Sequence, residues 1–168
     1  FNNSCHKNET VLQPIEDEGK LINPLFAELK NIGFSVENNR LVFQNEQEYL
    51  KCLDFLVKLG DANLSNFESE IGFKSYRQTY SNKPEKLKIF PDELYQAILN
   101  PDMEIIIGNY LFREDPESKT TLTFPISNAD CMLKSSELGI SPVKINWNDN
   151  AFDILNGNVS LKSAMVED

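Results

Sequence analysis

Histidine is almost absent from this chain of 168 residues, which contains a single one, His6. Hydrolases of the Ser-His-Asp or Cys-His type need a positioned imidazole, and His-based zinc sites need imidazole ligands. Glycine is also scarce, and none of the 7 glycines fits the phosphate-binding patterns G-x-x-x-x-G-K or G-x-G-x-x-G. We therefore expect a protein that is not an enzyme and that has no catalytic residues, no metal and no cofactor.

Basic residues are outnumbered, with 16 Lys and Arg against 26 Asp and Glu, which gives a net charge of −10. Nucleic acids and anionic lipids both need a basic surface, so the charge argues against either as a partner. No hydrophobic run approaches the roughly 18 residues of a membrane span. We expect membrane association only through a lipid anchor, and a folded core because 40% of the residues are hydrophobic.

Cysteine occurs three times, and no two cysteines are spaced as C-x-x-C, which argues against zinc and thioredoxin-like sites. Cys52 falls within an expected helix and is typical of a small buried residue. Cys131 fits the same description, and a Cys52–Cys131 disulfide is an open alternative. The odd count leaves one cysteine for another role.

That third cysteine, Cys5, follows a small residue, Ser4, and precedes a polar and charged stretch. This arrangement resembles the end of a bacterial lipoprotein signal, where diacylation of a cysteine anchors a domain to a membrane. Asn2 stands where such signals usually have Leu, and a free or disulfide-bonded Cys5 is the alternative. We expect residues 1–22 to form a flexible tether with lipid attachment at Cys5.

The first half of the chain carries helix signals. Hydrophobic spacing, Asn caps, prolines and terminal glycines predict helices over 24–32, 46–59, 64–70 and from Pro91 to Leu99. In the second of these, Tyr49, Leu53, Leu56 and Val57 are expected to form the apolar face. A hairpin is predicted over 34–43, because Asn38-Asn39 suits a turn with positive φ.

The second half carries strand signals. Strands are predicted over 103–107, 110–113, 120–124, 143–147, 151–155 and 159–161, with a helical segment over 129–138. The predicted class is α+β, with a helix-rich N-terminal half packed on antiparallel hairpins of the C-terminal half. Residues 23–168 are expected to form a single domain, and a separate small β subregion over 126–168 is left open.

Carboxylates are the remaining candidates for chemistry. A glycoside hydrolase needs only two carboxyls at a suitable separation, and Trp147 and tyrosines suit sugar stacking. Pairs with close spacing are Asp102/Glu104, Asp115/Glu117 and Asp149/Asp153. Oxygen side chains over 146–153 also suit calcium, although the Gly and distal Glu of an EF-hand are missing. Surface charge near turns explains the same residues.

Three blocks of sequence follow one another in order, namely 41–50 (LVFQNEQEYL), 71–77 (IGFKSYR) and 99–113 (LNPDMEIIIGNYLFR). Together they resemble a broad group of secreted or surface lipoproteins of Bacteroidota whose function is not established. The resemblance covers about residues 34–115, roughly half of the chain. It supplies no catalytic residues, and it implies an exported protein anchored through a cysteine near the mature N-terminus, which Cys5 matches.

The expected function is that of a non-enzymatic module of the bacterial cell envelope, either anchored to the outer membrane or periplasmic. It would bind a protein or a glycan, or serve as a subunit of an envelope complex. The expected contact residues are Tyr76, Tyr80, Asn109 and Trp147, provided that they are exposed. A carboxylate-based glycan hydrolase is the alternative function.

Overall fold

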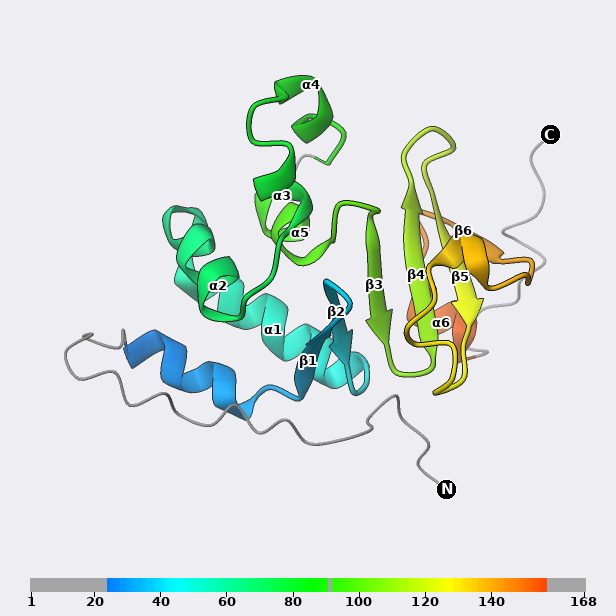
Figure 1. The fold of residues 1–168 in the computed structure, drawn as a ribbon, viewed down its shortest axis with the longest axis horizontal. Coiled ribbons are helices and arrows are strands. Elements are labelled where there is room, and N and C mark those ends of the chain that lie inside the picture. The colour runs from blue at the N-terminus through cyan, green and yellow to red at the C-terminus, as the bar shows by residue number, and fades with distance from the viewer. Residues whose placement is uncertain (1–23, 91, 157–168) are drawn as a thin grey trace.

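The computed structural model describes residues 24–90 and 92–156, and Figure 1 shows their arrangement. The strands are β1 (Phe34–Glu37), β2 (Arg40–Phe43), β3 (Glu104–Ile107), β4 (Tyr110–Asp115), β5 (Thr120–Pro125) and β6 (Val143–Asn146). The helices, with η marking 3-10 helices, are η1 (Pro24–Asn31), α1 (Glu46–Leu59), η2 (Asp61–Asn63), α2 (Leu64–Glu70), α3 (Tyr76–Thr79), α4 (Pro84–Leu87), α5 (Glu93–Ile98), η3 (Ser135–Glu137) and α6 (Ala151–Leu155). The predicted α+β class is confirmed. The tether with Cys5 and His6, Pro91 and the expected strand over 159–161 lie outside the described residues.

The strands form one sheet in the order β1-β2-β3-β4-β5-β6. Every neighbouring pair is antiparallel except β2–β3, which is parallel. A parallel pair needs a crossover, and the chain between β2 and β3 supplies it with the helices α1 to α5. The antiparallel pairs are joined by hairpins or by the segment 126–142.

Alternating side chains of the sheet enter two hydrophobic clusters. Leu41, Phe43 and Ile105 face the helices, whereas Val42 and Ile106 face the opposite side. That opposite side is covered by the segment around Cys131. Because both faces of β3 are covered, its residues form an uninterrupted buried run rather than an alternating one.

A buried ion pair fixes the segment that covers the second face. The Arg40 guanidinium lies 3.3 Å from a carboxylate oxygen of Glu104 and donates hydrogen bonds to the carbonyls of Cys131 and Leu133. Glu104 also accepts a hydrogen bond from the backbone N–H of Ser135. The two charges therefore compensate each other within the fold, and Arg40 and Glu104 have a structural role.

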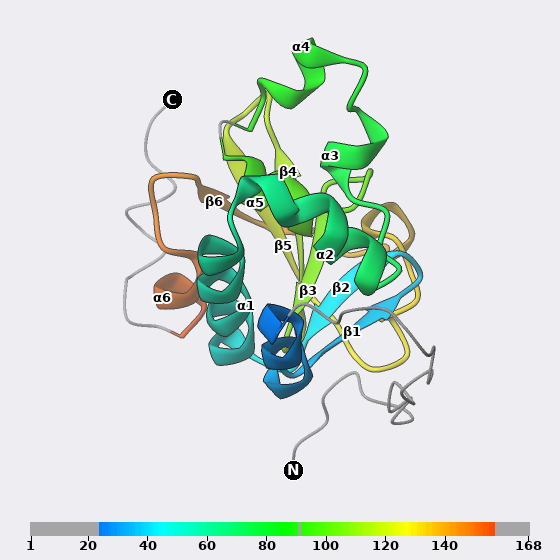
Figure 2. The ribbon, with the colours of Figure 1, turned by 90° about the vertical axis from the view of Figure 1, so that its left-hand side faces the viewer.

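Apart from the short η3, which belongs to the segment over the opposite face, the helices lie on one face of the sheet, as the two views at right angles show (Figures 1 and 2). α1 and α5 pack over β2 and β3. α6 packs beside them, with the Phe152 ring 5.7 Å from the Phe112 ring and 6.1 Å from the Tyr49 ring, centroid to centroid. The segment from 143 to 156 thus shares the sheet and the main hydrophobic cluster.

Two local predictions in the second half are wrong. Residues 129–138 form turns and the short η3 rather than a helix. Residues 151–155 form α6 rather than a strand, because the Asn150 side chain accepts a hydrogen bond from the Phe152 backbone N–H and caps the helix. In α1, Val57 is 65% exposed instead of buried with Leu56.

Candidate functional site: an acidic and aromatic cleft over the sheet

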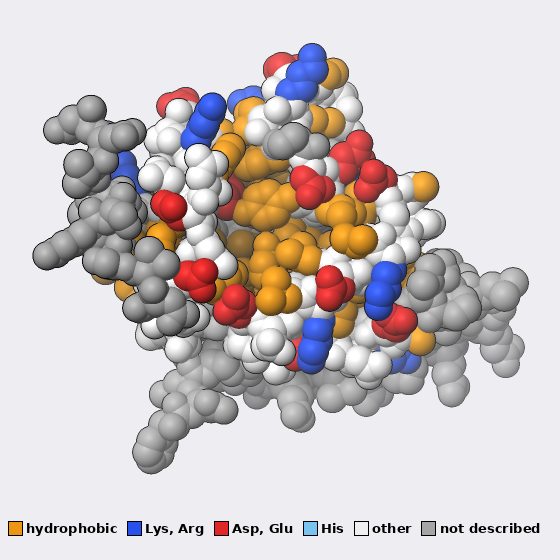
Figure 3. Space-filling model, turned by 180° about the vertical axis from the view of Figure 1, so that it is seen from behind, with side chains coloured by type: hydrophobic (Ala, Val, Ile, Leu, Met, Phe, Trp, Pro, Cys, Tyr) orange, Lys and Arg blue, Asp and Glu red, His pale blue; other side chains and the backbone are white. Residues whose placement is uncertain are grey.

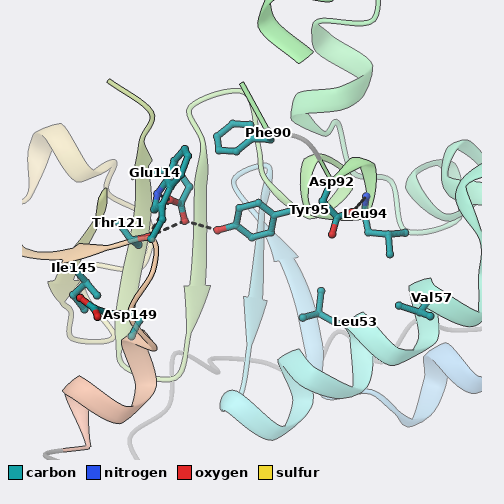
Figure 4. A pocket seen from close by; sticks show the side chains of 12 residues that line it. Leu53, Val57, Phe90, Asp92, Leu94, Tyr95, Glu114, Thr121, Ile145 and Asp149 are labelled. Atoms are coloured by element: carbon teal, nitrogen blue, oxygen red, sulfur yellow. Dashed lines mark hydrogen bonds between the residues drawn. The ribbon is translucent and has the colours of Figure 1, made fainter. Parts of the chain in front are cut away.

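An open cleft of about 460 Å³ lies on the helical face of the sheet, beside the helices that cover β2 and β3. The face is seen in Figure 3, where hydrophobic side chains gather in one area with Asp and Glu side chains around them. Figure 4 shows the lining from close by. The lining residues are Leu53, Val57, Phe90, Asp92, Leu94, Tyr95, Glu114, Thr121, Ile145, Trp147, Asp149 and Ala151.

The floor of the cleft comes from three adjacent strands. Glu114 of β4 is paired in register with Thr121 of β5, and Thr121 is paired with Ile145 of β6. Side chains of directly paired residues point to the same face of a sheet. The register therefore brings a carboxyl, a hydroxyl and an aliphatic side chain together on the helical face.

The walls come from helices and loops. Leu53 and Val57, one helical turn apart on α1, form one side, and Leu94 and Tyr95 of α5 lie next to them. Opposite, the ring of Phe90 lies 5.9 Å from the ring of Trp147, centroid to centroid, at an interplanar angle of 38°. The walls are thus mainly apolar and aromatic.

Glu114 is the central polar residue of the cleft, with only 4% of its surface exposed. Its carboxylate accepts hydrogen bonds from the Trp147 Nε1 at 2.6 Å, from the Thr121 hydroxyl at 3.0 and 3.2 Å, and from the Tyr95 hydroxyl. All three donors are neutral. They hold the carboxylate in place without compensating its charge.

Burial sets the ionisation behaviour of this group. Loss of hydration raises the pKa of Glu114, and the hydrogen bonds from Tyr95, Thr121 and Trp147 lower it by less. Burial and the neighbouring Glu114 charge also raise the pKa of Tyr95 well above its usual value. Tyr95 therefore stays a phenol, and a hydrogen-bond donor, at any physiological pH.

The arrangement suits binding better than proton transfer. Both oxygens of Glu114 already accept hydrogen bonds from side chains of the fold, so a substrate would have to displace one of them. The second carboxyl group, of Asp92, accepts a hydrogen bond from the backbone N–H of Leu94 at 2.8 Å and caps α5. The cleft offers aromatic faces, aliphatic walls and negative charge.

The residues expected at the binding surface are separated by the fold. Trp147 is 36% exposed and lines the cleft. Tyr76 is buried at 2% exposure and donates a hydrogen bond to the carbonyl of Lys86, so it does not meet the condition of exposure on which its expected role as a contact residue depends. Tyr80 is partly buried against the Tyr76 ring. Asn109 is exposed at the β3–β4 hairpin and lines a second, open hollow of about 600 Å³. Cys5 lies outside the described residues.

The carboxylate pairs that the sequence suggests do not come together in the cleft. Glu104 pairs with Arg40 in the interior, whereas Asp102 pairs with Lys134 at the surface. Asp115 accepts a hydrogen bond from the hydroxyl of the neighbouring Ser118. Only Asp149 of those pairs lines the cleft. Among residues 24–90 and 92–156, no group of three or more His, Cys, Asp or Glu side chains is placed to hold a metal ion.

Sequence reasoning missed Glu114, Tyr95 and Phe90. A signal for Glu114 was present, because it lies two residues after Phe112 and therefore on the same, core-facing side of its strand. A carboxyl on the buried face of a strand is unusual and indicates a specific set of partners. No comparable local signal marks Phe90.

Comparisons with known proteins gave no match. No family model, curated protein or solved structure is significantly similar to the chain. In the part of the chain that the structure describes, no helix is long and apolar enough to cross a membrane.

Cys131 is disulfide-bonded and Cys52 is a buried free thiol, so the alternative of a Cys52–Cys131 disulfide is wrong.

Proposed function

We propose that the protein is a non-enzymatic binding module of the bacterial cell envelope, and that its binding site is the cleft. The observation that carries the proposal is the combination of an open apolar cleft with a fixed, buried carboxylate at its floor. Sites for ligands are typically concave and mostly apolar, with a few placed polar groups that orient the ligand. The partner is a protein or a glycan of the envelope.

The state of the cysteines supports the location. Disulfides persist in oxidising compartments outside the cytoplasm, and Cys131 is disulfide-bonded. Burial in α1 shields the thiol of Cys52 from oxidants and raises its pKa to about 12, so that it stays an unreactive thiol. A periplasmic or outer-membrane location therefore fits both residues.

The fate of Cys5 decides between anchored and soluble forms. Cys5 lies outside the described residues, and a sulfur that carries a lipid cannot also form a disulfide. Intact mass of the protein from its native envelope separates the two. A diacylglycerol adduct at Cys5 supports the lipid anchor, whereas a mass two hydrogens below the fully reduced chain excludes it.

The cleft is tested by blocking it. Val57 lies at the cleft and is largely exposed, so Val57→Arg should fold normally and place a long side chain over the opening. We expect cross-linking in intact envelopes to trap a partner with the wild type and not with this variant. Asn66→Arg, at an exposed position of α2 outside the cleft lining, is the matched control. Equal capture by all three proteins would exclude the cleft as the binding site.

A glycan hydrolase is the second candidate, favoured by the meeting of Asp92, Glu114 and Asp149 in a cleft with Trp147. A raised pKa is typical of a carboxylic acid that protonates a leaving group, and burial raises that of Glu114. Release of reducing ends from peptidoglycan or envelope polysaccharides, abolished in Glu114→Gln, would establish this activity. No release by the wild type would remove it.

A further inference from the structure

We infer that the cleft receives a basic side chain, lysine or arginine, from an apolar segment of a partner polypeptide. The inference rests on the proposed function and names the chemistry of its ligand. Three features of the cleft carry it, namely the sign of its charge, the shape of its apolar walls and the absence of a counter-ion for its buried carboxylate.

The charged residues of the lining are all acidic. Asp92, Glu114 and Asp149 contribute carboxyl groups, and none of the lining residues is Lys or Arg. The whole chain carries a net charge of −10, which adds to the negative potential at long range. An anionic ligand such as a phosphate or a carboxylate would meet repulsion, whereas a cation would be attracted.

Glu114 lacks a counter-ion in the described part of the chain. The other buried carboxylates there that form ion pairs, Glu104 and Glu68, each contact an arginine. Glu114 is buried to a similar extent, yet its partners are a phenol, an alcohol and an indole, and no ion pair of the described residues includes it. A ligand cation at the cleft would offset this charge through space, with the three hydrogen bonds of Glu114 kept in place.

The apolar walls suit the aliphatic stem of such a side chain. The ring of Trp147, which is 36% exposed and supported from behind by the buried Phe90 ring, offers a face to which an ammonium or guanidinium group is attracted. The methylene groups behind the charge prefer apolar contact, which Leu53 and Val57 provide.

The apolar surface also continues beyond the cleft. Leu50 is 44% exposed and lies three residues before Leu53 on α1, hence on the same side of the helix as Leu53 and Val57. A single amino acid would leave this stripe uncovered. A segment that carries apolar residues beside its basic residue would cover both the stripe and the cleft, which favours a polypeptide over a small cation.

Three capped peptides test the inference, with the sequences Leu-Lys-Leu-Lys-Leu, Leu-Gln-Leu-Gln-Leu and Leu-Glu-Leu-Glu-Leu. Trp147 is the only tryptophan of the chain and lines the cleft, so its fluorescence reports on binding directly. We expect the lysine peptide to bind at least about tenfold more tightly than the glutamine peptide, and the glutamate peptide not to bind. Raising the salt from about 0.05 to about 0.5 M should reduce this preference, because it shortens the screening length.

Variants that each remove one negative charge show which carboxylates cause the preference for the lysine peptide. Asp92→Asn keeps the cap of α5, since asparagine caps as well as aspartate does, and Asp149→Asn changes an exposed side chain. Each should weaken binding of the lysine peptide by about two- to fivefold. Asp61→Asn, at an exposed position of η2 outside the cleft lining, removes the same charge and should leave the affinity unchanged.

The outcomes separate the inference from the proposed function. Equal binding of the lysine and glutamine peptides, each lost in Val57→Arg, would overturn the inference and leave the cleft as a binding site. Equal weakening by Asp61→Asn and the two cleft variants would also overturn it, since overall charge alone would then explain the preference. No binding of any peptide overturns the inference as well, and the cross-linking comparison then decides the proposed function by itself.

Discussion

At the scale of single residues, Glu114 shows how one side chain links stability to a binding site. Its three neutral donors come from α5, β5 and the loop after β6, so the carboxylate joins parts of the chain that are distant in sequence. Removing it leaves a phenol, a hydroxyl and an indole N–H without their acceptor. An unsatisfied buried donor is destabilising, although water entering the open cleft reduces the effect.

We expect Glu114→Ala to lower the free energy of unfolding by about 1–3 kcal/mol for this reason. Urea denaturation followed by circular dichroism measures the change. Glu117→Ala, at an exposed position in the turn after β4, should stay within about 0.5 kcal/mol of the wild type. Similar values for the two variants would show that the hydrogen bonds of Glu114 contribute little to stability.

At the scale of elements, the β1–β2 hairpin shows a turn that also binds its neighbours. Asn38 and Asn39 have φ angles of 49° and 54°, which the twist of a two-residue hairpin favours. The Asn39 side chain also donates to the carbonyl of Lys74 at 3.0 Å and accepts from its N–H at 2.9 Å. The turn thus fixes the chain between α2 and α3.

Two substitutions separate these roles. Asn39→Gly keeps the left-handed backbone and loses the two hydrogen bonds, so we expect a loss of about 1–2 kcal/mol in stability. Asn39→Ala loses the same bonds and also forces a β-carbon into a left-handed conformation, which adds roughly 1 kcal/mol. Thermal unfolding of both variants measures the difference. Equal stability of the two would exclude backbone strain as a factor.

The start of α1 gives a prediction about pH. The Gly33 N–H donates to Glu48 at 2.6 Å, and this bond, followed by the Lys51 ammonium, lowers the pKa of Glu48 below 4.5. A lowered pKa in the folded state contributes stability above the unfolded value, and that contribution is lost as the pH falls through the folded value.

We therefore expect Glu48→Gln to be less stable than the wild type at neutral pH, with the two stabilities converging as the pH falls below 4.5. Denaturant titrations over this range measure it. Glu70→Gln, at an exposed position of α2, is the control and should stay within about 0.5 kcal/mol of the wild type at neutral pH. A difference that persisted unchanged into acid would contradict a charge-dependent contribution of Glu48.

Elements with complete local signals were predictable from sequence. Asn45 accepts a hydrogen bond from the Glu48 N–H and Gly60 ends the helix, so the bounds of α1 follow from its caps. The strand predicted over 151–155 is wrong because it gives more weight to the apolar residues than to the cap at Asn150, which starts α6. The cleft was not predictable, because it depends on the register that pairs Glu114 with Thr121 and Thr121 with Ile145. Of the residues that line the cleft, the sequence indicates only Trp147 and Asp149 as candidates for function.

At the scale of the whole molecule, the described residues should unfold as one unit. β6 completes the sheet, and Phe152 of α6 contacts rings of β4 and α1. We expect thermal transitions followed by Trp147 fluorescence and by far-ultraviolet circular dichroism to coincide. Ile106→Ala, in the central strand, should lower both midpoints together, since a large-to-small change in the core costs about 2–5 kcal/mol. Two separated transitions would identify an independent subregion.

The single parallel contact of the sheet has a consequence for how the chain folds. Each antiparallel ribbon, β1–β2 and β3 to β6, can assemble from neighbouring residues, but the two ribbons join through β2 and β3, where Val42 pairs with Ile106 and Phe43 with Ile107. Pairing β2 with β3 orders the long stretch of chain between them, and this loss of conformational freedom slows folding. We therefore expect the rate-limiting step of folding to be the pairing of β2 with β3, together with the docking of the crossover helices.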